Sequence, residues 1–125
     1  MAEIMVLDDV LDAVILIRRI LERGGHHVSV FTEEEDAIEY ARNHAVDLAI
    51  LDIKLKKMSG VEVLEELKKI DKNISVMMLS GYPTLETARR SIDLGADEYC
   101  VKPIEKYELE EKVAAMLARR AAKGV

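Results

Sequence analysis

Side chains that bind metals or react with electrophiles stand at the ends of four short apolar runs in this sequence. They are Asp8 and Asp9, Asp52, Ser80 and Lys102. Mg²⁺ is commonly held by one or two carboxylates together with a phosphate oxygen and waters, and an ammonium can reach a carboxylate or phosphoryl oxygen. Asp52 is the group left to attack phosphorus, because carboxylates can accept phosphoryl groups covalently. A helix cap is the simpler role for Asp52, but it would not explain the second acidic site or the lysine.

Five apolar runs predict strands that are covered on both faces, as in a parallel sheet. These runs are residues 4–7, 28–31, 48–51, 76–80 and 99–102. Apolar residues at helical spacing predict helices over about residues 10–21, 33–44, 61–70 and 85–92, and from Lys106 onward. Alternating strands and helices imply right-handed crossovers between parallel strands. The expected fold is therefore α/β, a doubly wound five-stranded parallel sheet with five helices.

The order of the strands does not follow from periodicity, so the position of the acidic residues is open at this point. Ligands of open α/β sheets bind beyond the carboxyl ends of the strands. If the first and third strands are neighbours, Asp8, Asp9 and Asp52 converge there. Their mutual repulsion would then raise pKa values or require a cation.

Composition describes an ordinary globular chain, expected to form one domain over residues 1–125. A formal net charge of -6 and no evident basic patch argue against direct binding of nucleic acid. No apolar run approaches the roughly 18 residues that span a bilayer, and no basic signal-like start is present. We therefore expect a cytoplasmic protein without a membrane partner. The single cysteine, Cys100, is expected to be a small buried hydrophobic residue.

At these residues the chain resembles the receiver domain of bacterial two-component response regulators. The resemblance extends along essentially the whole chain and rests on short motifs in the same order and at similar spacings: Leu7-Asp8-Asp9, Leu51-Asp52, Met58-Ser59-Gly60, Leu79-Ser80-Gly81, Gly95-Ala96-Asp97-Glu98-Tyr99 and Lys102-Pro103. It implies the flavodoxin-like strand order 2-1-3-4-5, for which a receiver domain is itself a standard example.

The resemblance also implies a role for each acidic residue. Asp52 would accept a phosphoryl group from a phosphohistidine of a histidine kinase or histidine phosphotransferase. Asp9 would bind Mg²⁺ directly and Asp8 mostly through water, with Asp52 and the main-chain carbonyl of Lys54 as further ligands. The expected cofactor is therefore Mg²⁺.

A conformational switch is implied as well. Ser80 would move to bond a phosphoryl oxygen, Lys102 would pair with the phosphoryl group, and Tyr99 would turn from exposed to buried. A downstream protein or output domain would recognise the change at the fourth and fifth helices and the fifth strand. The Lys102-Pro103 peptide bond would be cis.

The chain departs from the family pattern in the loop after Asp52. Lys56 stands where proline is usual and Ser59 where an acid is usual. Lys54 and Tyr82 occupy the two places that flank the water attacking the acyl phosphate. We expect these bulky side chains to slow dephosphorylation.

Three apolar residues, Leu11, Ile15 and Leu16, lie off or beside the inward face of the first helix. They predict an exposed patch beside the acidic site, where receiver domains commonly dock a kinase. The alternative is that the second and fifth helices cover part of this face.

Two other functions compete with the phospho-acceptor interpretation. A Mg²⁺-dependent phosphohydrolase with an aspartyl nucleophile commonly carries a second Asp two residues later, where this chain has Lys54. A pseudo-receiver that only binds partners would need a defective acidic site, whereas every residue of this site is present.

Overall fold

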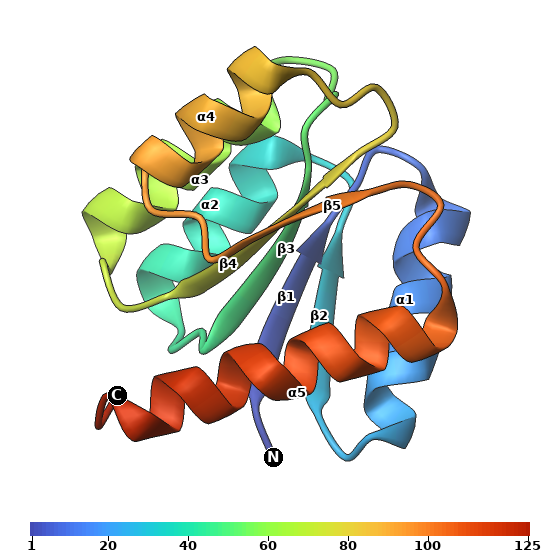
Figure 1. Ribbon diagram of the computed structural model, residues 1–125, viewed down its shortest axis with the longest axis vertical. Coiled ribbons are helices and arrows are strands. Elements are labelled where there is room, and N and C mark those ends of the chain that lie inside the picture. The colour runs from blue at the N-terminus through green and yellow to red at the C-terminus, as the bar shows by residue number, and fades with distance from the viewer.

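A five-stranded parallel sheet lies between two layers of helices in the computed structural model, which describes residues 1–125 (Figure 1). The strands are β1 (Glu3–Leu7), β2 (His27–Phe31), β3 (Leu48–Asp52), β4 (Ser75–Ser80) and β5 (Glu98–Val101). The helices are α1 (Leu11–Arg23), α2 (Glu34–Asn43), α3 (Gly60–Ile70), α4 (Leu85–Asp93) and α5 (Lys106–Ala122). None of them combines the length and the apolar character needed to cross a bilayer. The predicted fold class and all ten elements are confirmed.

The strand order is β2-β1-β3-β4-β5, as the family resemblance implied. Leu7 pairs with Leu51 and Asp52 pairs with Leu79, so β1, β3 and β4 end at nearly the same level. The residues that follow these strands therefore lie together, beyond the carboxyl ends of the strands. Both chain termini lie at the opposite end of the sheet (Figure 1).

The alternating side chains of each strand enter two separate cores. Met5 and Leu7 of β1 pack in the core under α2 and α3, whereas Ile4 and Val6 pack in the core under α1 and α5 (Figure 1). Apolar burial on both faces is what selects a continuous apolar run rather than an alternating one. Cys100 is buried in the second core, as expected, and burial raises the pKa of its thiol to about 11.

The fourth helix is present where its apolar residues Leu85, Ala88 and Ile92 predict it, but these residues do not form its covered face. Leu85 and Ile92 are 75% and 54% exposed, and Ala88 is only half-buried. The fully buried residue is Ser91, whose hydroxyl donates to the carbonyl of Thr87 at 2.7 Å. Because α4 packs against α3 and the edge strand β5, only a narrow polar face of the helix is covered.

A close backbone approach fixes the loop between β3 and α3. The amide of Gly60 donates to the carbonyl of Ile53 at 2.7 Å, and a Cβ at Gly60 would overlap the carbonyl oxygen of Asp52. Ser59 caps α3 in a reciprocal capping box with Glu62. The glycine thus closes the loop directly behind Asp52.

We expect Gly60→Ala to lower the free energy of unfolding by about 1–3 kcal/mol, because the added methyl group would displace backbone atoms. Urea unfolding followed by circular dichroism measures this change. Gly81→Ala is the matched control, since a Cβ there would meet nothing within 4 Å. Equal unfolding midpoints for the two variants would contradict the steric explanation.

Candidate functional site

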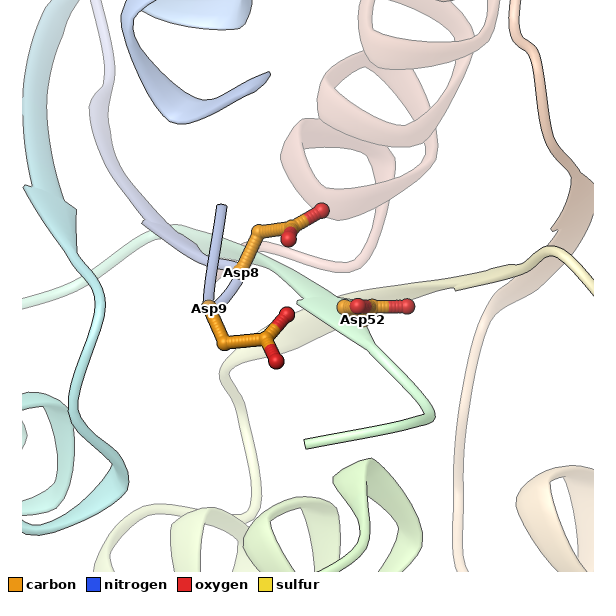
Figure 2. A group of neighbouring side chains, drawn as sticks. All are labelled: Asp8, Asp9 and Asp52. Carbon is orange, nitrogen blue, oxygen red and sulfur yellow. The ribbon is translucent and has the colours of Figure 1, made fainter. Parts of the chain in front are cut away.

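Three carboxylates meet beyond the ends of β1 and β3. One oxygen each of Asp8, Asp9 and Asp52 lies within 4.8 Å of the others. Figure 2 shows the three side chains together, with Asp8 and Asp9 following β1 and Asp52 at the tip of β3. Asp8 and Asp52 are buried, at 2% and 6% exposure, whereas Asp9 is partly exposed. The predicted convergence of the acids is therefore observed.

Lys102 brings a positive charge to this cluster from the end of β5. Its ammonium lies 2.6 Å from Asp8 Oδ2 and 3.3 Å from Asp52 Oδ1. Its backbone amide donates to the carbonyl of Ser80 at 2.8 Å, and the peptide bond to Pro103 is cis, as expected. Burial opposes the charged form of Lys102, but the hydrogen bond to Asp8 and the charge of Asp52 outweigh it and raise the pKa. Lys102 therefore stays an ammonium at neutral pH.

The carboxyl group of Asp52 is held in an unfavourable environment for a negative charge. Burial is the main cause that raises its pKa, and the charge of Asp8 adds to it, while Lys102 opposes both. Asp52 does not cap a helix, since Ser59 caps α3. An all-oxygen set that repels itself fits a small hard cation such as Mg²⁺, which takes carboxylate oxygens and keeps waters.

Ser80 and Tyr99 lie on the side of the site towards α4. Ser80 is buried at the end of β4, and its hydroxyl accepts from the amide of Tyr82 at 3.2 Å. Tyr99 is half-buried rather than exposed, and its hydroxyl lies 2.9 Å from the hydroxyl of Thr87 in α4. Thr87 carries no signal in the sequence, because nothing local connects a helix hydroxyl to a strand tyrosine.

The ammonium of Lys54 lies over the ring of Tyr82, 5.2 Å from its centroid. Together with Asp9, Asp52 and Lys102, these two side chains line an open hollow above the carboxylates. The structure therefore brings Lys54 and Tyr82 together at the site, as their expected role requires.

The predicted exposed patch on α1 is only partly correct. Leu11 and Leu16 are 57% and 58% exposed, whereas Ile15 is half-buried. Ile15 lies next to Val14 on the helix surface, and Val14 is fully buried. Leu16 also lines a mainly apolar hollow that extends from Asp8 and Lys102 along Ile104.

Because the pKa of Asp52 is raised, we expect removal of its charge to stabilise the folded protein at neutral pH but not at low pH. Below pH about 4 the carboxyl is neutral in both the folded and the unfolded state, and it costs no stability. As the pH rises through the higher folded pKa, the charge destabilises the fold. We expect Asp52→Asn in metal-free buffer to raise the free energy of unfolding at pH 7 by about 1 kcal/mol, and to have no such effect at low pH.

Urea unfolding at several pH values in EDTA measures this difference. Glu111→Gln, which neutralises an exposed carboxylate on α5, is the control. A gain for Asp52→Asn that is equally large at low pH, or absent at pH 7, would show that charge repulsion is not its cause.

Comparisons with known proteins agree with this geometry. A family model described as "Response regulator receiver domain" matches residues 4–114. The chain is 32% identical over 117 residues to the alkaline phosphatase synthesis transcriptional regulatory protein PhoP of Bacillus subtilis, covering 94% of this chain and 49% of that protein. It is 28% identical over 116 residues to the transcriptional regulatory protein ZraR of Escherichia coli, covering 93% of this chain and 26% of that protein.

The structural neighbours are of the same kind. A CheY-like response regulator receiver domain protein from Methanospirillum hungatei superimposes with a TM-score of 0.96 at 30% identity, with 98% of each chain covered. The receiver domain of a putative LuxO repressor from Vibrio parahaemolyticus gives a TM-score of 0.92 at 26% identity, with 98% of this chain and 95% of that one covered. The chain spans about a quarter to a half of the length of its curated relatives. With the acidic site, the fold and the family match in agreement, this chain belongs to the receiver domains of two-component response regulators.

Proposed function

We propose that residues 1–125 form a phospho-acceptor domain in which Asp52 takes a phosphoryl group from a phosphohistidine of a histidine kinase or histidine phosphotransferase. The observation that supports this proposal is the juxtaposition of Asp8, Asp9 and Asp52 within 4.8 Å, with Lys102 bonded to two of them. Such a cluster offers one carboxylate as nucleophile and others as metal ligands.

In the proposed reaction an oxygen of Asp52 attacks phosphorus, the phosphorus–nitrogen bond of the donor breaks, and its electron pair stays on the imidazole nitrogen. Asp9, Asp8 and the main-chain carbonyl of Lys54 would hold Mg²⁺, which neutralises charge on the transferring group. Lys102 would donate to a phosphoryl oxygen, and it is already positioned 3.3 Å from Asp52 Oδ1. The residues act by position and charge rather than by proton transfer.

We propose that the domain catalyses only its own phosphorylation and dephosphorylation. A phosphohydrolase of the aspartyl class would commonly use an acid two residues after the nucleophile, and Lys54 fills that position. A purely binding pseudo-receiver is disfavoured because the cluster is complete.

Phosphorylation would change the surface formed by α4, β5 and α5. Ser80 directly follows Leu79, the residue that pairs with Asp52, and would bond the new phosphoryl group. Tyr99 connects β5 to Thr87 of α4 through its hydroxyl. Large apolar side chains are exposed on this surface: Leu85, Ile92, Val101 and Tyr107. A partner protein or an output domain would bind there, and because the relatives are named transcriptional regulators, any contact with DNA would belong to such an output domain.

The phosphohistidine donor would approach from the side of α1. Leu11 and Leu16 form the exposed part of this proposed docking surface, and the half-buried Ile15 contributes a smaller area. The hollow beside Leu16 continues to Asp8 and Lys102, so a helix seated there would bring its histidine close to Asp52.

We expect incubation with acetyl phosphate and Mg²⁺ to add the mass of one phosphoryl group to the protein, measured by intact mass spectrometry. Asp52→Asn should remain unmodified, because its amide cannot attack phosphorus. Chelation of Mg²⁺ should abolish labelling of the wild type. An unaltered wild-type mass, or labelling that persists in Asp52→Asn, would overturn the proposed function.

We also expect Lys54→Ala/Tyr82→Ala to accelerate loss of the phosphoryl group by about fivefold. The Lys54 and Tyr82 side chains line the hollow over Asp52 through which water would approach, and a contact of this kind is worth ~1 kcal/mol. The rate is measured from the decay of the phosphorylated mass after removal of the donor. Lys56→Ala, which removes an exposed lysine of the same loop, should decay like the wild type; equal rates for all three proteins would exclude a shielding role.

A further inference from the structure

The loop that carries Lys54 is held from outside by a residue of another helix. Its base is closed by the bond from Gly60 to Ile53, and its outgoing end by the cap of α3. Between them, the backbone amide of Lys57 donates at 2.9 Å to Glu34 Oε2, the carboxylate of the first residue of α2. This contact joins residues that are 23 positions apart.

Glu34 is unusual because it is a charged residue with 1% exposure. Its second oxygen, Oε1, is buried and has no hydrogen-bond partner. Burying a carboxylate with incomplete bonding costs free energy, and the positive end of the α2 dipole offsets only part of that cost. The side chain of Glu34 thus makes one hydrogen bond, with the backbone amide of Lys57.

The apolar contacts of the loop do not replace this bond. Leu55 and Met58 pack against the core under α2 and α3, which holds their side chains. The direction of the backbone carbonyl groups from Lys54 to Met58 is not fixed by these side-chain contacts. Between Ile53 at the base of the loop and the cap at Ser59, the bond from the Lys57 amide to Glu34 is the side-chain hydrogen bond that restrains the backbone. The carbonyl of Lys54, the proposed metal ligand, lies in the restrained segment.

We propose that Glu34 is a positioning residue for the metal-binding loop: its buried carboxylate, bonded to the amide of Lys57, fixes the loop so that the Lys54 carbonyl faces the carboxylate cluster. This inference rests on the proposed function. It assigns to α2, which supplies none of the expected site residues, an effect on Mg²⁺ affinity that acts through the loop.

We expect Glu34→Ala to weaken Mg²⁺ binding about tenfold, the size typical of losing a partner that orients a metal ligand. Glu34→Gln should weaken it about threefold, because a neutral amide oxygen makes roughly half as strong a bond as a carboxylate. Mg²⁺ titration followed by NMR chemical shifts measures both. Labelling by acetyl phosphate should slow at low Mg²⁺ and return to the wild-type rate at saturating Mg²⁺.

Glu35→Ala is the matched control, because it removes the same charge from the same helix turn at an exposed position. Wild-type Mg²⁺ affinity in Glu34→Ala, or an equal loss in Glu35→Ala, would overturn the proposal. If Glu34→Ala does not fold, Glu34→Gln decides, and wild-type affinity in that variant counts against it. Failure of the proposed function is distinct, since the wild type itself would then neither bind Mg²⁺ nor gain mass.

Discussion

Repulsion among Asp8, Asp9 and Asp52 is the constraint on which the rest of the site depends. Two of these carboxylates are almost fully buried, and burial together with the neighbouring charge raises the pKa of Asp52. The ammonium of Lys102 compensates part of the negative charge by bonding Asp8 and Asp52. A site of this kind stores unfavourable electrostatic energy, which a divalent cation and an added phosphoryl group can redistribute. In the proposed function, this repulsion would make the site respond to a bound cation.

The parallel sheet is what maintains this unfavourable arrangement. Each of β1 and β3 is buried on both faces, so its carboxyl end cannot move away from its neighbour without exposing apolar residues of two cores. Asp8 directly follows β1 and Asp52 is the last residue of β3, where the chain leaves the sheet. The burial of apolar side chains in the two cores thus provides the free energy that holds the like charges together.

Two connections extend outward from the cluster to distant helices. The hydroxyl pair of Tyr99 and Thr87 joins the β5 side of the site to α4, a helix with only a narrow covered face. The carboxylate of Glu34 joins the loop after Asp52 to α2. The loosely packed α4 suits a segment that changes position, whereas the buried Glu34 suits one that stays fixed. The proposed signal would therefore leave the site mainly through α4 and β5.

The sequence by itself determined the elements and the residues at their ends, because apolar runs, helical periodicity and glycine or proline boundaries are local properties. It placed Asp52 and Lys102 at strand ends and Cys100 in the interior, and all three are there. Only the tertiary structure decided which strand ends are neighbours, since periodicity carries no information about pairing; here the strand order came from family resemblance. The polar covered face of α4, the half-buried position of Ile15 and the buried bond from Glu34 to Lys57 were equally hidden from the sequence. Each depends on contacts between residues far apart in the chain, where the packing of other elements, and not the local pattern, determines what is covered.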